Sequence, residues 1–323
     1  MFEEFWKSLG GSFDERWLLN TFGPALVFWG AGLWVWAQLV GLENALQLWR
    51  GYASEVRLFL GAAGLLLVFF TAVLLEAFEG AMLRFYEGYW PTWRALARRR
   101  ARDLRRKQER RRVLRTKIAI DQATPADRAE LARLDSDLAH RPRDPDRSMP
   151  TRLGDVLRTA EDYPRERYGL DPIVFWPRLF PQLSDPLRQA LGSAQDQLDL
   201  LLRLATLTAL HGLIWSIVVA AHGRWGVLWW TLPALPLAWL LWRSATRAAV
   251  GYTTLFRSSF DLHRFDVYRH MHWPPPTSPQ TERAHGAELI LFLLDGTGAS
   301  NVVYEQNSER EGEGEATGRR DNT

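Results

Sequence analysis

Four long apolar stretches interrupt an otherwise polar chain, and they lie at 22–42, 58–75, 204–221 and 225–242. The first has Gln38 as its only polar side chain, and the second has only Thr71. The third contains Thr206, Thr208, His211 and Ser216, the fourth contains Pro233 and Pro236, and neither has Asp, Glu, Lys or Arg. A helix of about 20 residues rises roughly 30 Å, the thickness of one hydrocarbon core. The pattern therefore predicts four transmembrane helices.

Composition agrees with this pattern. Apolar residues make up 47% of the chain, yet the mean hydropathy is −0.21, so apolar and polar residues are segregated along it. Such segregation is not typical of a soluble globular protein. The chain has no cysteine, which excludes disulfide bonds, cysteine-ligated metals and thiol catalysis. The first apolar stretch is too long for a signal peptide and follows an acidic segment, so we expect an uncleaved helix.

Lysine and arginine are distributed unevenly around the four stretches. Segment 94–117 holds 13 of them against two acids, whereas 43–57 holds only two, and the tight turn after residue 221 holds one. Because loops rich in Lys and Arg stay in the cytoplasm, both termini and the middle of the chain are expected there. We predict a multi-pass protein of a bacterial-type inner or plasma membrane.

The expected fold class is all-α, with two transmembrane hairpins that flank a helical insertion. In order, we expect a cytoplasmic N-terminal segment (1–21), a first transmembrane hairpin (22–75), a helical cytoplasmic insertion with an Arg-rich helical hairpin (76–203), a second transmembrane hairpin (204–242), cytoplasmic C-terminal helices (243–296) and a disordered tail (297–323). The tail has too few apolar residues to form a core.

The polar regions contain predicted helices separated by residues that end or start a helix. The second apolar helix has no strong breaker before Pro91, so we expect one continuous rod to that residue. A charged helix follows until 121–124, where Thr124 and Pro125 are typical of a new helix start, and the two helices are expected to pair antiparallel. Segment 172–181 is rich in aromatic and aliphatic residues and in proline. It fits either docking at the membrane interface or a small cytoplasmic core.

The arginine run admits three readings. It can anchor the chain beside anionic headgroups as a solvated helix face, or it can bind a phosphate-bearing lipid or nucleotide. Nucleic acid is not expected, because the run lacks interleaved aromatics and a recognised module. The candidate contacts for anionic lipid or phosphate are Arg98, Arg99, Arg102, Arg105, Arg106 and Arg110.

A second set of residues would suit an ion pathway. Glu76 and Glu79 share a helix face just beyond the second apolar stretch, where an oligomer would form an acidic ring. The alternative is that they pair with Arg84 or with a neighbouring helix at the water boundary. His211 is either a proton relay or a structural histidine. The pore or gate candidates are Leu67, Phe70, Thr71, Glu76, Glu79 and His211.

Catalytic and metal-binding patterns are weak. Asp266 and His270 lie four residues apart, but arginines interleave their cluster and no second group of ligands is evident, so no metal site is expected. None of the common hydrolase, metalloprotease or nucleotide-binding motifs occurs. We therefore expect neither an enzyme nor a cofactor.

Two functions fit these patterns. One is an oligomeric channel or pore gated by its cytoplasmic helices. The alternative is a non-conducting membrane anchor or scaffold, which presents the Arg-rich cytoplasmic helices to a protein or to anionic lipid. Small residues that permit close helix approach predict a homo-oligomer in either case, and they are Gly23, Gly30, Gly32, Gly61, Ala62 and Gly64.

Overall fold

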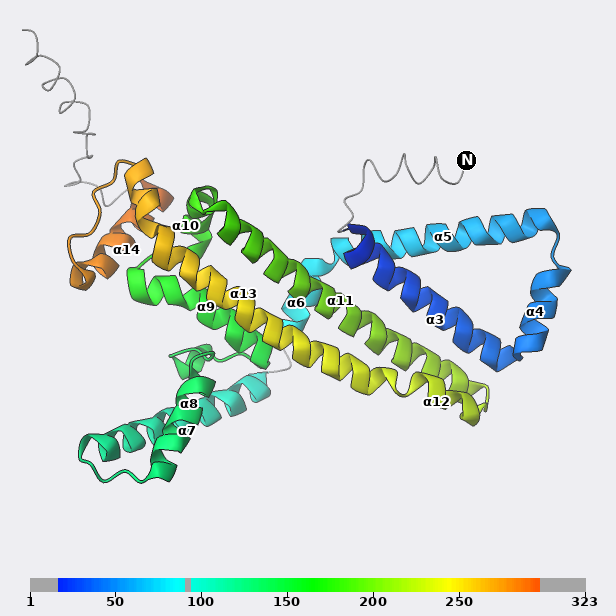
Figure 1. Ribbon diagram of the computed structural model, residues 1–323, viewed down its shortest axis with the longest axis horizontal. Coiled ribbons are helices and arrows are strands. Elements are labelled where there is room, and N and C mark those ends of the chain that lie inside the picture. The colour runs from blue at the N-terminus through cyan, green and yellow to red at the C-terminus, as the bar shows by residue number, and fades with distance from the viewer. Residues whose placement is uncertain (1–16, 91–93, 297–323) are drawn as a thin grey trace, which may run out of the picture. The chain divides into compact units, whose positions relative to one another are not determined.

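The computed structural model describes residues 17–90 and 94–296, and every regular element within them is helical (Figure 1). Four of these helices are long and apolar enough to cross a membrane. The all-α class and the four candidate spans are thus confirmed. The tail predicted from residue 297 and most of the N-terminal segment lie outside the described residues. The chain divides into two compact units, residues 1–157 with 192–252, and residues 158–191 with 253–323.

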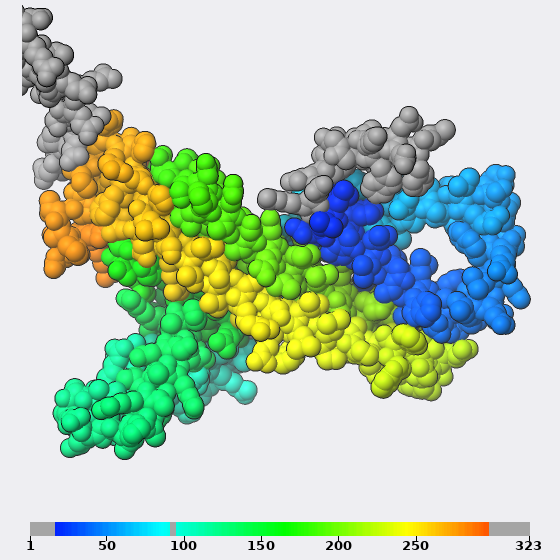
Figure 2. Space-filling view, in the orientation of Figure 1, coloured from blue at the N-terminus to red at the C-terminus, as the bar shows by residue number. Residues whose placement is uncertain are grey.

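The spans of the first unit meet through small and apolar side chains. A π-helical turn (Leu18–Phe22) leads into α3 (Gly23–Val40), and the second span is α5 (Ser54–Ala77). The third is the apolar part of α11 (Asp185–Ala221), a helix too long to lie wholly within one bilayer. Ala25, Ala72 and Leu207 bring α3, α5 and α11 into one buried cluster. Figure 2 shows that α3 and α5 separate towards α4, which leaves an opening between them.

A short amphipathic helix, α4 (Leu42–Gly51), joins the first two spans. Leu42, Leu46 and Trp49 share one of its faces and are exposed, while Glu43 and Arg50 lie on another. No helix was predicted for this connection from the sequence. A helix with one apolar face between two spans is typical of segments that lie in the headgroup layer.

The second span does not continue as one rod to Pro91, contrary to the prediction. α5 ends at Ala77, and Phe78 separates it from α6 (Glu79–Glu87). α6 ends because Gly88 adopts a φ of 94°, a conformation that glycine reaches without strain. The N–H groups of Gly88 and Tyr89 then donate to the carbonyl of Arg84, which completes the C-terminal cap.

The fourth span also differs from a single helix over 225–242. It begins as a 3-10 turn (Trp225–Val227) and a short helix, α12 (Leu228–Thr231). The chain breaks at 232–233, because Pro233 lacks an N–H group and restricts its neighbour. α13 (Ala234–His270) then runs without interruption through the residues that were expected to form a separate helix.

The charged segment forms α7 (Arg94–Ala119) and α8 (Pro125–Leu138), with the predicted interruption between them. Thr124 caps α8: its hydroxyl accepts from the N–H of Asp127, whose carboxylate accepts from the N–H of Thr124. A 3-10 turn (Pro145–Arg147) leads to α9 (Arg152–Tyr168). The side chains of α7 and α8 form one continuous mass (Figure 2).

The second unit contains an aromatic core. Its elements include α10 (Pro172–Leu179), a 3-10 turn (Phe180–Gln182), α14 (Pro279–Asp295) and the last part of α13. Phe175 is fully buried, and its ring stacks on that of Phe260 at 5.9 Å between centroids. Of the two readings of segment 172–181, these contacts support the small core. Ile173, on the other face of α10, is 82% exposed.

Candidate functional site

The arginine run is divided between two faces of α7. On the inner face, Leu104 and Leu114 are fully buried. Basic residues that flank these leucines form ion pairs with acids of α8. Residues near the end of α7 pair with residues near the start of α8, so the two helices run antiparallel. The pairs are Lys107 with Asp137 at 2.9 Å, Arg110 with Glu130 at 2.8 Å, Arg111 with Asp135 at 2.5 Å and Lys117 with Asp127 at 3.5 Å.

The outer face of α7 presents arginines to solvent. Helical spacing places Arg99, Arg102 and Arg106 together there, and we call this set the α7 arginine face. Arg98 lies on the same side of the helix but makes a contact of its own. In the described ranges, neither Arg99 nor Arg106 has an ion-pair partner, and Arg102 donates only to the backbone of its own helix. The six predicted contact residues therefore separate, because Arg105 pairs with Asp146 and Arg110 with Glu130.

The acids of the α7–α8 pair have perturbed pKa values. Burial alone would raise the pKa of Asp137, but the hydrogen bond from Lys107 and the charges of Arg141 and Lys107 outweigh it. Its pKa is therefore lowered. The same balance, with Arg141 as the leading donor, lowers the pKa of Asp103. The bidentate hydrogen bonds from Arg110 lower the pKa of Glu130. All three groups are thus held in their charged form.

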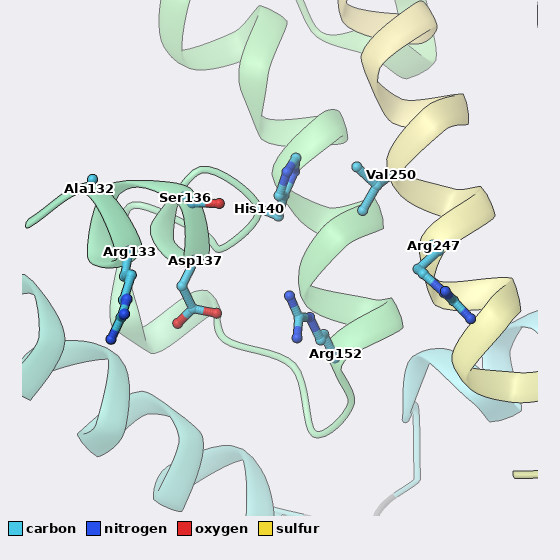
Figure 3. A pocket seen from close by; sticks show the side chains of 8 residues that line it. All are labelled: Ala132, Arg133, Ser136, Asp137, His140, Arg152, Arg247 and Val250. Atoms are coloured by element: carbon cyan, nitrogen blue, oxygen red, sulfur yellow. The ribbon is translucent and has the colours of Figure 1, made fainter. Parts of the chain in front are cut away.

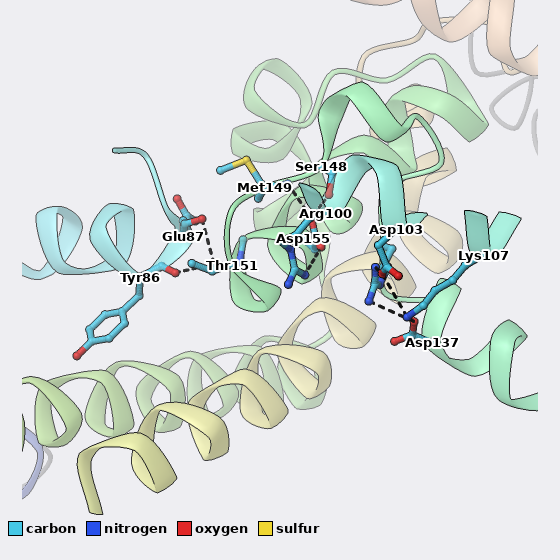
Figure 4. A network of polar contacts seen from close by, with 12 residues as sticks. Tyr86, Glu87, Arg100, Asp103, Lys107, Asp137, Ser148, Met149, Thr151 and Asp155 are labelled. Atoms are coloured by element: carbon cyan, nitrogen blue, oxygen red, sulfur yellow. Dashed lines mark hydrogen bonds and ion pairs between the residues drawn. The ribbon is translucent and has the colours of Figure 1, made fainter. Parts of the chain in front are cut away.

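A polar network joins this helix pair to its neighbours (Figure 4). The fully buried carboxylate of Asp155 accepts from Arg100 at 2.5 Å and from the N–H of Met149 at 2.7 Å. Thr151 precedes α9; its hydroxyl lies 2.7 Å from the carbonyl of Tyr86 and accepts from the N–H of Gly154. Contacts to both α7 and α6 therefore hold the start of α9.

The apolar pore candidates lie on a largely exposed surface of α5. Leu67 and Phe70 are 42% and 59% exposed. Thr71 accepts from the indole N–H of Trp29 at 3.0 Å and donates to the carbonyl of Leu67. His211 of α11 lies between aromatic rings, edge-on to Phe28 at 6.2 Å between centroids. Among the described residues, no hydrogen bond joins His211 to Leu67, Phe70 or Thr71.

The two acidic candidates have partners at the polar end of the spans. Glu76 accepts from the indole N–H of Trp17 at 2.9 Å. Glu79 accepts from Arg203 at 2.8 Å, and Arg203 also donates to Thr21 at 2.8 Å. Asp199 contributes a side-chain hydrogen bond to the same Glu79. These contacts correspond to the alternative reading, in which the glutamates pair at the water boundary.

Arg203 was not predicted as a site residue, although its position in the sequence is informative. Arg203 directly precedes the third apolar stretch, and Glu79 closely follows the second. Two opposite charges at the same end of neighbouring spans are natural partners, but a single sequence does not show which spans are neighbours.

The Asp and His cluster near residue 266 makes local contacts. Asp261 accepts from Tyr163 at 2.8 Å and from Tyr168, and Asp266 bonds His263 at 2.8 Å. Among the described residues, no three Asp, Glu or His side chains are placed to share a metal ion. Comparisons with family models, with curated proteins and with solved structures give no match to this chain.

Proposed function

We propose that the chain is a non-conducting membrane anchor, with its α7–α8 pair in the cytoplasm and the α7 arginine face directed at anionic phospholipid. One observation carries this proposal: acids neutralise the inner arginines of α7, whereas Arg99, Arg102 and Arg106 on the outer face have no acidic partner among the described residues. If the outer face of α7 contacted only water, this difference in ion pairing between its two faces would not be expected.

The chain length between the bilayer and α7 supports this target. Only 16 residues, 78–93, separate α5 from α7, and nine of them form α6, which rises about 14 Å. Basic residues next to a membrane gain about 1 kcal/mol each from an anionic leaflet. The outer face also carries Val113, which is 42% exposed and suits the headgroup boundary.

The channel hypothesis has less support from the contacts. An acidic ring needs Glu76 and Glu79 free to face an axis, but Trp17 and Arg203 already hold them. The exposed side chains of α5 are predominantly apolar, as they are in helices that face lipid. We therefore favour the anchor over a hydrophobic gate.

Lipid contact can be tested on the full chain in liposomes, because the protein has no native cysteine. A polarity-sensitive dye on a Val113→Cys variant should report a less polar environment when phosphatidylglycerol is added to phosphatidylcholine. Substitution of Arg99, Arg102 and Arg106 with Gln should abolish that response. As a charge-matched control, Arg128, Arg178 and Arg269 are changed to Gln, which should preserve it. Equal responses in the two triple variants would overturn the proposal.

Ion flux separates the anchor from the channel. Leu67→Ser and Phe70→Asn would hydrate a constriction lined by α5, so a channel should leak more ions in proteoliposomes. For an anchor, flux should equal that of protein-free vesicles in both variants. An increased leak, together with weaker cation preference in a Glu79→Gln variant, would establish the channel instead.

A further inference from the structure

A second basic site lies away from the α7 arginine face, in an open pocket of about 760 Å³. Figure 3 shows side chains from three separate parts of the chain around it. Arg133, Ser136 and Asp137 belong to α8, Arg152 begins α9, and Arg247 lies on α13. The volume is within the range of small-molecule sites, which is about 300–1,000 Å³.

The charges of this pocket are not balanced. Among the described residues, Arg133 has no acidic partner, and Arg247 donates only to the Ser244 hydroxyl at 3.1 Å. Arg152 points towards Asp137 in Figure 3, and its charge helps to lower the pKa of that carboxyl, although the two side chains form no ion pair. Lys107 and Arg141 already engage that carboxylate, at 2.9 and 3.3 Å.

This imbalance contrasts with the contact between α7 and α8. Between α7 and α8, acids match the basic residues that face each other. Arg152 lies between Arg133 and Arg247 in Figure 3, and like charges that line one pocket repel one another unless a bound anion offsets them. A guanidinium donates in a planar fork that fits phosphate oxygens, and the Ser136 hydroxyl offers a further donor.

We propose that the pocket lined by Arg133, Arg152 and Arg247 binds a phosphate group of a phosphorylated ligand. Arg247 lies five residues after Trp242, about 7.5 Å along α13 beyond the last apolar residue of the fourth span. A lipid headgroup can therefore reach the site, and so can a soluble phosphate compound. Both sources present the same chemistry to the three guanidinium groups.

The test uses the full chain in nanodiscs. Pyrophosphate is titrated in phosphatidylcholine nanodiscs, and binding is measured by calorimetry. In a second arm, phosphatidic acid is incorporated into the discs and the increase in melting temperature is recorded. Response to pyrophosphate identifies a soluble ligand, and response to phosphatidic acid alone identifies a headgroup. No response in either arm would overturn the proposal.

Variants then locate the binding. Arg152→Gln and Arg247→Gln should each weaken it about tenfold or more, as expected for loss of a charge-assisted hydrogen bond. Arg128→Gln, an exposed change on α8, should bind like the wild type. If Arg152→Gln fails to fold, Arg133→Gln and Arg247→Gln decide the matter, because both residues are exposed. Unchanged affinity in these variants would exclude the pocket.

The α7 triple variant keeps this result separate from the proposed function. Substitution of Arg99, Arg102 and Arg106 with Gln should leave pyrophosphate binding unchanged, because none of them lines the pocket. Loss of pyrophosphate binding in that variant would show that the phosphate site is on α7 and not in this pocket.

Discussion

Arg203 donates a hydrogen bond of 2.8 Å to Glu79, across 124 residues of sequence. The arginine is 8% exposed, and it also donates to Thr21 and to the carbonyl of Asn20. One side chain of α11 thus joins the start of the first span to the end of the second. The pair therefore gives an acidic residue beside three apolar helices a partner within the chain.

Arg203→Gln should therefore destabilise the membrane bundle. The change leaves Glu79 and Thr21 without their donor, and loss of a hydrogen bond to a charged group costs about 1.5–3 kcal/mol. Thermal unfolding in detergent should show a lower melting temperature. Asp199→Asn is the matched comparison, since a carboxyl that hydrogen-bonds another carboxyl must carry a proton, which an amide imitates. A larger loss in Asp199→Asn than in Arg203→Gln would contradict this account.

Two glycines on neighbouring spans should respond differently to alanine. A β-carbon on Gly32 would lie 3.1 Å from the Trp215 indole nitrogen, so Gly32→Ala should loosen the contact between α3 and α11 and lower the melting temperature. Gly61 has open space around it, and Gly61→Ala should leave that temperature unchanged or slightly higher. The reverse order would show that another contact covers Gly61.

The open side of α5 leads to a separate expectation about assembly. We propose that a second copy of the chain packs on Gly61 and Gly64, where small residues allow close approach. Gly64→Leu should then reduce the particle mass measured in detergent without altering the fold. If wild type and variant are both monomers, lipid alone covers this surface.

The α7–α8 pair should loosen in acid. The pKa values of Asp103, Glu130 and Asp137 are lowered in the folded chain, so these groups add stability above the pKa of the unfolded state, about 4. That stability is lost as pH falls below about 4 through the lower folded values. Hydrogen exchange, corrected for its intrinsic pH dependence, should increase first in 95–138. Uniform protection of that segment at pH 3 would refute the expectation.

Local features of the fold were predictable because they depend on neighbouring residues. Apolar length located the four spans, and Thr124 with Pro125 marked the start of α8. The break before α7 was missed because Gly88 was not recognised as a helix cap. The division of α7 into a paired and an unpaired face could not be predicted either, because the sequence shows the arginines but not which of them face acids of α8.

The candidate sites were less predictable, because their residues come from distant segments. Arg133, Arg152 and Arg247 look like ordinary surface residues until α8, α9 and α13 place them around one pocket. Likewise, Glu79 was recognised as unusual, but its partner Arg203 belongs to another span. Pairing between helices is long-range information that composition and periodicity do not contain.

Membrane orientation is the premise shared by both proposals, and the lack of native cysteine makes it directly testable. Gln47 is exposed on α4, and Ser193 is exposed on α11 before its apolar part. If the arginine-rich region is cytoplasmic, an impermeant maleimide should label Gln47→Cys in intact cells, and Ser193→Cys only after the membrane is opened. Labelling of both variants after lysis controls for reactivity. The opposite pattern would place the α7 arginine face outside the cell, away from the anionic inner leaflet, and would remove the basis of the anchor proposal.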